Sequence, residues 1–380
     1  MAALSMTMAA LGMTRGGCPL SSGVVYACIL VTGGAGFVGS NLALRMRGRY
    51  PDARIIAADN LVRRGSEFNL PRLSANNIEF VRADVRKSDD LTFPNIPFDL
   101  ILECSAEPSV LAGYDVGPTY LIDTNLNGTV NCLEVARRTN ADFVFMSTSR
   151  VYPIAALESL AVHEDATRFT LTADQKLPGA SAKGIAEDFP LAGARSLYGA
   201  TKLCSELIIE EYADMYGLRY MINRCGVITG PWQMGKVDQG VFALWMGKHY
   251  FDRPLQYIGY GGTGKQVRDF VSIDDLGELV QTQLDRFDAL PDRLYNVGGG
   301  LASSLSLLET TALCEEITGN RVEIERIAEN RPLDVKLYVT DNARVERDTG
   351  WVPAKTPRET LSEIFAWIHD NEALVAPLWR

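Results

Sequence analysis

The stretch of sequence that decides the fold lies at residues 24–39 and reads VVYACILVTGGAGFVG. A run of apolar and β-branched residues leads into Gly33, Gly36 and Gly39, and an amphipathic segment begins after them. This order predicts a buried strand, a tight turn and a helix. Such a turn presents main-chain N–H groups and the positive end of the helix to a pyrophosphate. The stretch therefore predicts a Rossmann-type, doubly wound parallel sheet of the α/β class.

The end of the next apolar run indicates which dinucleotide binds. Residues 54–59 read RIIAAD, and Asp59 follows the last glycine by about 20 residues. An acid at this position binds the ribose hydroxyls of NAD and repels the 2′-phosphate of NADP. Arg63 and Arg64 are close enough in sequence to receive that phosphate, but a solvated face or a substrate contact is the better interpretation. We therefore expect NAD as the cofactor.

Composition and charge exclude several classes of protein. The chain has 380 residues, of which 47% are hydrophobic and 22% charged, as in an ordinary soluble enzyme with one large or two medium domains. The net charge of -10 argues against a nucleic-acid surface and a basic membrane-binding face. Since no apolar run is long enough to span a bilayer, we expect neither nucleic acid nor membrane as a partner.

The cysteines and the N-terminal segment give two further expectations. The seven cysteines are scattered and form no C-x-x-C pair, which indicates free thiols in a reducing compartment, and hence a cytoplasmic protein without a metal site. Residues 1–23 are rich in Met, Ala, Gly and Ser and lack the early positive charge of a signal peptide. We interpret them as an N-terminal extension, or as the product of a start codon placed too early.

Strand and helix patterns alternate between residues 24 and 226, which predicts a parallel sheet covered by helices on both faces. We expect a dinucleotide-binding domain at 24–226 and a smaller C-terminal α/β domain at 227–380 that mainly binds substrate. Both ligands should meet at the carboxyl ends of the strands. The expected strands of the first domain lie at 24–31, 54–59, 78–83, 98–104, 142–147 and 219–225. Its expected helices lie at 37–49, 118–139 and 198–216.

Two later segments carry the chemistry. Tyr198 and Lys202 share one face of a predicted helix because they are four residues apart. A lysine ammonium lowers the pKa of a neighbouring phenol, so the tyrosine can accept a proton from a sugar hydroxyl near neutral pH. The other segment, FMSTSRVY at 145–152, ends a predicted strand, and its hydroxyl groups should emerge beside the nicotinamide. A tyrosine and lysine at this spacing mean little alone, but after the glycines and Asp59 they indicate an enzyme.

Taken together, these motifs resemble the extended short-chain dehydrogenase/reductase family, which contains nucleotide-sugar epimerases and dehydratases. The resemblance covers residues 24 to about 355. It implies that Thr148, Tyr198 and Lys202 are catalytic. It implies cofactor contacts from Gly33, Gly36, Phe37, Val38, Gly39, Asp59, Asn60, Asp84, Val85, Ser105, Ala106, Asn125, Tyr198 and Lys202. It implies substrate contacts from Glu107, Ser149, Arg150, Gln233, Asp238, Gln239, Arg268 and Arg331.

The arginines in such motifs of the family hold the diphosphate of the substrate. Guanidinium groups suit this task because their paired N–H donors match phosphate oxygens. For this chain the resemblance assigns that role to Arg268 and Arg331.

Departures from the family pattern reduce the number of reactions that we expect of this chain. The 4,6-dehydratases of the family carry an Asp-Glu pair directly after the catalytic threonine, because eliminating water needs an acid and a base. Ser149 and Arg150 occupy these places here, which argues against dehydration. The interval from Thr148 to Tyr198 is longer than in the 4-epimerases, so we expect an insertion at about 154–195 beside the substrate entrance. Glu103 stands where the family often has a histidine.

Residues 223–240 and 257–269 are similar to the CDP-paratose 2-epimerases, a group within this family. This similarity implies NAD-retaining epimerisation at C2 of a CDP-linked deoxyhexose. The alternatives are a C4 or UDP-sugar epimerase, a 4,6-dehydratase or decarboxylase, and a non-catalytic NAD-binding regulator. The apolar residues that follow Lys202 on its helix, with the family's usual pairing, lead us to expect a homodimer or homotetramer.

Overall fold

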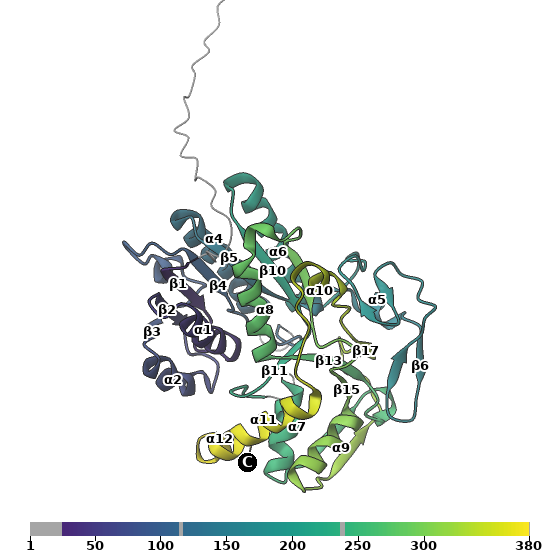
Figure 1. Cartoon of the computed structure of the whole chain (residues 1–380). Coiled ribbons are helices and arrows are strands. Elements are labelled where there is room, and N and C mark those ends of the chain that lie inside the picture. Colours follow the sequence, from purple (N-terminus) through teal and green to yellow (C-terminus); the bar gives the residue numbers. More distant parts are fainter. Residues whose placement is uncertain (1–24, 114–116, 236–239, 380) are drawn as a thin grey trace, which may run out of the picture.

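A computed structural model describes residues 25–113, 117–235 and 240–379 (Figure 1). Its centre is a seven-stranded sheet with the order β14-β10-β5-β4-β1-β2-β3, in which all neighbouring strands are parallel. The strands are β1 (Cys28–Thr32), β2 (Arg54–Asp59), β3 (Glu79–Arg82), β4 (Leu100–Glu103), β5 (Asp142–Thr148), β10 (Tyr220–Cys225) and β14 (Leu294–Val297).

The strand order reverses between β1 and β4. From β1 the chain moves outward to β2 and β3, then returns to place β4, β5, β10 and β14 on the other side. In doubly wound sheets, ligands bind beyond the carboxyl ends of the strands at this reversal. Thr32 and Glu103, the last residues of β1 and β4, pair with each other across it.

Helices cover both faces of the sheet, as Figure 1 shows. Alternate residues of β1 point to opposite faces: Ile29 and Val31 belong to one buried apolar cluster, Cys28 and Leu30 to another. The helices on the first face are α1 (Phe37–Arg49) and α8 (Ile273–Asp285). Those on the second face are α4 (Gly128–Thr139) and α6 (Leu197–Tyr216). The expected doubly wound α/β fold is confirmed.

A second, smaller unit follows β10. Its sheet contains β11 (Val227–Thr229), β13 (Val267–Ser272), β15 (Ser304–Ser306) and β17 (Leu337–Tyr338), and β12 (Leu255–Ile258) pairs with β16 (Ile324–Ile327). Its helices are α7 (Val241–Tyr250), α9 (Leu307–Thr318), α11 (Pro357–Asp370) and α12 (Glu372–Trp379). Helix α10 (Ala343–Thr349) instead packs against β14 and α8 of the first domain. Helices α7, α9, α11 and α12 pack around one apolar core, at the bottom of Figure 1. The chain also returns from this unit to add β14 and α8 to the first domain.

The remaining elements lie in connections. The first domain contains α2 (Leu70–Ala75), α3 (Thr119–Ile122) and a π-helical turn at Asp123–Asn127. The expected insertion contains α5 (Ile154–Glu158) and two hairpins, β6 (Val162–Glu164) with β7 (Phe169–Leu171) and β8 (Ala180–Ser181) with β9 (Gly184–Ile185).

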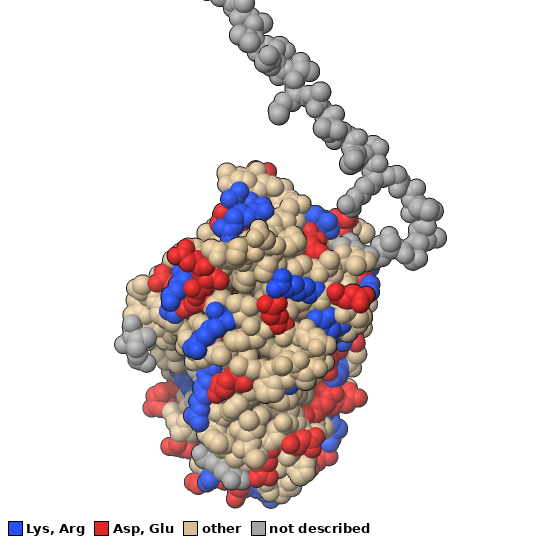
Figure 2. All heavy atoms as spheres, turned by 90° about the vertical axis from the view of Figure 1, so that its left-hand side faces the viewer, with Lys and Arg blue, Asp and Glu red and all other residues tan. Residues whose placement is uncertain are grey.

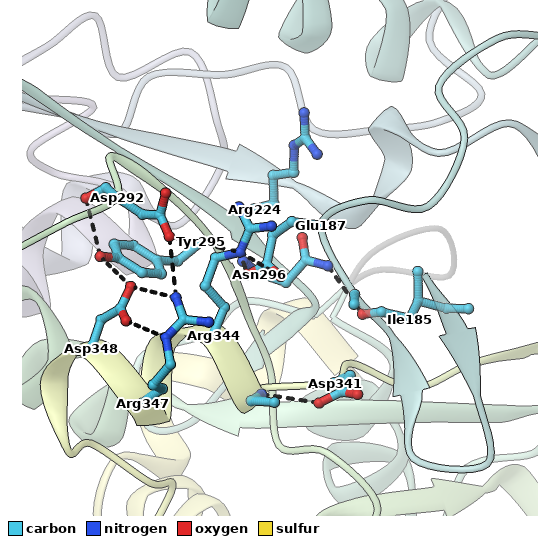
Figure 3. A network of polar contacts seen from close by, with 12 residues as sticks. Ile185, Glu187, Arg224, Asp292, Tyr295, Asn296, Asp341, Arg344, Arg347 and Asp348 are labelled. Atoms are coloured by element: carbon cyan, nitrogen blue, oxygen red, sulfur yellow. Dashed lines mark hydrogen bonds and ion pairs between the residues drawn. The ribbon is translucent and has the colours of Figure 1, made fainter. Parts of the chain in front are cut away.

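Buried polar contacts fasten this insertion to β14 and α10 (Figure 3). The carboxylate of Glu187, which is 8% exposed, accepts a hydrogen bond of 2.8 Å from the main chain of Asn296 and lies 3.3 Å from the guanidinium of Arg344. The Asn296 side chain donates to the carbonyl of Ile185. Because these groups satisfy one another away from water, the insertion has a fixed position beside the sheet.

None of the helices in the described part of the chain has the length and apolar character needed to cross a membrane. On the face shown in Figure 2, basic and acidic side chains are intermixed.

Candidate functional site

A cavity of about 550 Å³ lies at the carboxyl ends of β1, β2, β4 and β5. The first domain and the smaller unit both contribute to its wall. Most of the residues predicted for the site line this cavity. They are Gly33, Gly36, Phe37, Val38, Gly39, Asp59, Asn60, Val85, Ser105, Ala106, Glu107, Thr148, Ser149, Arg150, Tyr198, Lys202, Gln233 and Arg268.

The glycine turn is built so closely that side chains are excluded. Gly33 has a φ of +61°, and a Cβ at this residue would lie 2.7 Å from the carbonyl oxygen of Cys104. A Cβ on Gly39 would meet the carbonyl oxygen of Gly33. Helix α1 starts at Phe37 and has no acidic residue in its first turn, so no carboxylate of its own competes for the N–H groups there. The turn therefore fits a pyrophosphate.

Asp59 ends β2 at the wall of the cavity. Its carboxylate accepts hydrogen bonds from the main-chain N–H groups of Ala35 (3.2 Å) and Leu61 (2.8 Å), which fix it beside the glycine turn. Burial raises the pKa of Asp59, and these main-chain donors act in the opposite direction. A fixed carboxylate at this position fits the ribose diol of NAD.

The residues predicted after β3 and β4 divide into two groups. Val85 and Ser105 line the cavity, and Ser105 Oγ is buried with no hydrogen-bond partner among the described residues. An orphaned buried hydroxyl at a cavity wall fits a polar ligand such as the dinucleotide. Asp84 lies outside the cavity lining, and its hydrogen bonds with Arg86 hold its pKa below the usual range.

Asn125 lies behind the wall and does not line the cavity. Its side chain is fully buried in the π-helical turn, accepts a 2.8 Å hydrogen bond from the Glu107 main-chain N–H and donates a 3.0 Å one to the Glu107 carbonyl. These two bonds fix the main chain of a cavity residue. Asn125 thus positions the wall from behind.

The predicted catalytic residues come together. Thr148 ends β5, and Tyr198 lies in the first turn of α6, where Ser196 caps the helix by accepting a hydrogen bond from the N–H of Gly199. Burial raises the pKa of Tyr198 to about 12, while a hydrogen bond with Thr148 and the charge of Arg150 act to lower it. Lys202, one turn later, is 1% exposed and also lines the cavity.

Two guanidinium groups line the cavity as well, and one of them, Arg150, follows Thr148 closely, its main-chain N–H donating to Thr148 Oγ1 at 3.2 Å. Arg268 on β13 is engaged by the carboxylate of Asp334, and Arg150 donates to the carbonyl of Leu333 at 3.2 Å. Burial, and then the charge of Arg268, lower the pKa of Arg150 to about 10. No carboxylate of the described residues lies within ion-pair distance of Arg150. Two adjacent cations with one carboxylate between them fit an anionic ligand.

One described substrate residue of the prediction is not part of the cavity lining, and two others are not described. Arg331 lies outside its lining. Asp238 and Gln239 lie outside the described residues. Gln233 does line the cavity, and its amide is held by Thr229 Oγ1 at 2.7 Å and the Ile228 carbonyl at 2.9 Å.

The cavity also has lining residues that the sequence did not single out. They come from the loop after Asp59, from β11 and the segment after it, and from β17, and include Val62, Gly65, Ser66, Asn69, Val227, Met234 and Tyr338. Arg63 and Arg64, which the sequence offered as substrate contacts or a solvated face, line the cavity too. Trp232 lines it as well, with an unusual φ of +71°. A turn-forming glycine (Gly65) and a tryptophan after Gly230-Pro231 were the available signals in the sequence.

Comparisons with known proteins agree with this geometry. Residues 29–298 match the family described as "NAD dependent epimerase/dehydratase family". The CDP-paratose 2-epimerase of Salmonella typhi is 29% identical over 357 residues, which cover 89% of this chain and 98% of that protein. A dTDP-glucose 4,6-dehydratase of Mycobacterium tuberculosis is 26% identical over 354 residues, covering 92% of this chain and 96% of the relative.

Solved structures have the same fold. The UDP-glucose 4-epimerase of Thermotoga maritima with UDP-glucose superposes with a TM-score of 0.71 at 23% identity, covering 91% of this chain and 99% of that chain. The UDP-glucuronic acid 4-epimerase of Bacillus cereus, in complex with UDP-glucuronic acid and NAD, gives a TM-score of 0.71 at 22% identity, covering 90% and 99%.

Proposed function

The chain belongs to the NAD dependent epimerase/dehydratase family and is an NAD-dependent nucleotide-sugar epimerase, and we propose that it inverts C2 of a CDP-linked deoxyhexose while retaining NAD. The similarity to CDP-paratose 2-epimerase over nearly its whole length supports the choice of nucleotide and carbon. The glycine turn and Asp59 supply the expected cofactor cradle.

The identity of the two residues after Thr148 is the observation that favours epimerisation over dehydration. Ser149 and Arg150 line the cavity there, and the carboxylates among the described lining residues are Asp59 and Glu107. Asp59 belongs to the cofactor end, and Glu107 accepts a hydrogen bond from its own loop at Ser109. Elimination of water needs an acid and a base at adjacent carbons. Oxidation and reduction of a single hydroxyl needs one proton acceptor, which Tyr198 supplies.

In the reaction at C2, the cofactor takes part in hydride transfer and the protein in proton transfer. Held by the glycine turn and Asp59, NAD would supply the acceptor for the hydride of C2 and the donor for its return. The Tyr198 phenolate accepts the proton of the C2 hydroxyl as the C2–H bond breaks, which leaves a ketone at C2. Thr148 holds the same oxygen. After the sugar has turned within the cavity, Tyr198 gives the proton back to that oxygen while C2 is reduced on its other face, so no net oxidation occurs.

The charges around Tyr198 must assist this proton transfer, because burial alone raises the pKa of its phenol. The charge of Arg150 acts to lower the pKa of Tyr198, and Lys202 lies one turn further along the same helix. Both cations favour the phenolate, the form that the mechanism requires.

Epimerisation at C4 of a UDP-linked sugar acid is the second candidate. The UDP-glucuronate 4-epimerase of Thermodesulfobacterium geofontis is 26% identical over 361 residues. Arg150 favours this candidate because its guanidinium would match a carboxylate on the sugar as well as a phosphate.

A substrate panel separates the two candidates. Purified protein is incubated without added NAD with CDP- and UDP-linked sugars, and the products are assigned by proton NMR. Inversion at C2 of a CDP-sugar supports the proposal. Inversion at C4 of a UDP-sugar, or a 4-keto-6-deoxy product, would replace it with the corresponding alternative.

We also propose a cytoplasmic homodimer or homotetramer. The described cysteines are all free, as in a reducing compartment. On α6, Leu207 and Met215 are 55% and 64% exposed, and pairing of this helix with its copy in a second subunit would cover them. Light scattering after gel filtration gives the subunit number.

A further inference from the structure

Three segments that are far apart in the sequence meet at the cavity wall beside Asp59. They are the loop at 61–69, the segment at 230–235 and the C-terminal helix α12. The loop and the middle segment both line the cavity. Helix α12 lies outside the lining and fastens the other two.

The loop contacts the middle segment directly. The guanidinium of Arg63 donates to the carbonyl of Met234 at 3.4 Å. A Cβ on Gly65, which has a φ of +94°, would lie 2.6 Å from Cγ of Met234, closer than side chains approach each other. Met234 is 9% exposed and packs into the core of the smaller unit. The loop at 61–69 and the segment at 230–235 are therefore in direct contact at the cavity wall, and no space is left between them for an additional side chain.

The C-terminal helix holds both segments from outside. The guanidinium of Arg64 donates to the carbonyl of Pro377 at 3.0 Å, and the indole N–H of Trp379 donates to the carbonyl of Gly235 at 3.2 Å. Trp379 is 2% exposed and packs against Trp367. A single helix is thus hydrogen-bonded to both sides of the contact.

The far end of the loop is tied to the glycine turn. Asn69 is 1% exposed and donates to the carbonyl of Ala35 at 2.9 Å, while Arg72 donates to the Asn69 side chain at 2.7 Å. The Arg72 guanidinium also stacks on the ring of Trp232 at 4.2 Å. The loop is consequently held at both of its ends, next to the residues that fit the pyrophosphate and ribose of the cofactor.

From this arrangement we infer that Arg64, Met234, Pro377 and Trp379 form a clasp that retains NAD in the protein between turnovers. A redox-neutral epimerase returns the hydride to its own substrate, so a cofactor that left in its reduced form would end the cycle. The clasp connects the loop at 61–69 to the segment at 230–235 beside Asp59, where the dinucleotide is expected to bind. In this proposal the dinucleotide leaves only after these contacts have separated. The inference rests on NAD binding and is independent of which sugar is inverted.

Dissociation of NAD is the measurement that tests the clasp. Two substitutions remove one hydrogen bond each with little change in packing. Arg64→Met replaces an exposed residue, and Trp379→Phe keeps an aromatic ring at a buried one. Arg138→Met is the matched control, since Arg138 also donates to a main-chain carbonyl, that of Leu91, but does not line the cavity. NAD-loaded proteins are diluted, and the NAD remaining bound is measured by absorbance after rapid desalting and acid release.

A hydrogen bond contributes about 0.5–1.5 kcal/mol, which corresponds to about a two- to tenfold change in a rate. We expect NAD to dissociate about two- to tenfold faster from Arg64→Met and from Trp379→Phe, and faster still from the double variant. Arg138→Met should release NAD at the rate of the unchanged protein. Equal rates in all of these proteins would overturn the clasp. Because no sugar is present, this result does not depend on the proposed reaction.

Discussion

The ammonium of Lys202 lies 3.6 Å from the carboxylate of Glu103, and both side chains are at most 2% exposed. Glu103 Oε1 accepts a hydrogen bond from the Ser105 N–H, while Oε2 has no hydrogen-bond partner among the described residues and faces the lysine. Burial raises the pKa of Glu103, and Lys202 opposes that rise. The positive charge of Lys202 therefore acts both on the Glu103 carboxylate and on the Tyr198 phenol.

Replacing Glu103 should change the pH dependence of the reaction. Glu103 acts to raise the pKa of Tyr198, so Glu103→Gln should lower it. Because the phenolate is the active form, activity is lost as the pH falls through this pKa. We therefore expect the acid limb of kcat/KM to move to lower pH. Glu107→Gln, which changes a carboxylate that lines the cavity but is not among the charges that act on the pKa of Tyr198, should leave the position of the limb unchanged. An unmoved limb in Glu103→Gln, or a shift to higher pH, contradicts this account.

Replacing Tyr198 removes the proton acceptor. Tyr198→Phe should lower kcat by about a hundredfold to ten-thousandfold, the usual contribution of a general base, while NAD content and melting temperature stay close to those of the unchanged protein. Tyr212→Phe is the control on the same helix, because the Tyr212 hydroxyl donates to Glu134 away from the cavity. Substantial turnover by Tyr198→Phe would show that another group takes the proton.

Arg150 should matter more for substrate binding than Arg331. Hydrogen bonds to charged groups contribute about 1.5–3 kcal/mol, so Arg150→Met should weaken binding of the nucleotide sugar by about ten- to a hundredfold, with partial recovery in Arg150→Lys. Arg331→Met should have a smaller effect because Arg331 does not line the cavity. Dissociation constants from calorimetry decide this, and a larger loss in Arg331→Met would contradict the geometry.

A buried ion pair should support the helix that carries Tyr198. Arg224 on β10 donates to the Glu206 carboxylate at 2.7 Å, and the two side chains are 4% and 2% exposed. Glu206→Gln leaves the guanidinium without its counter-charge, which should cost about 3–5 kcal/mol in the free energy of unfolding. The exposed pair of Glu134 and Arg137 gives the comparison, since Glu134→Gln should cost at most about 1 kcal/mol. Denaturant unfolding measures both, and equal losses would contradict the role of burial.

Local patterns predicted much of the fold. The helix expected at 37–49 is α1 with the same bounds, and the strand expected at 54–59 is β2 with the same bounds. Both segments have a strong apolar pattern and a turn signal at each end. The first strand begins at Cys28 instead of residue 24, since hydrogen bonding to the neighbouring strands, and not apolar character, sets where a strand starts.

The site was predictable where its residues lie in one motif, and less so where it depends on contacts between distant segments. The spacing of Tyr198 and Lys202 was visible because both lie on α6. The contact of Lys202 with Glu103 joins two elements of the fold, and no local pattern encodes it. The same holds for Arg64 and Pro377, which only the packing of α12 brings together.

The central claim, return of one hydride to C2 of the same sugar, is tested most directly with a label. A CDP-deoxyhexose carrying deuterium at C2 is incubated with purified protein in H₂O without added NAD, and the product is examined by proton and deuterium NMR. The account predicts a C2 epimer that keeps its deuterium at C2. Loss of the deuterium to water, or inversion at C4 with C2 unchanged, would contradict it.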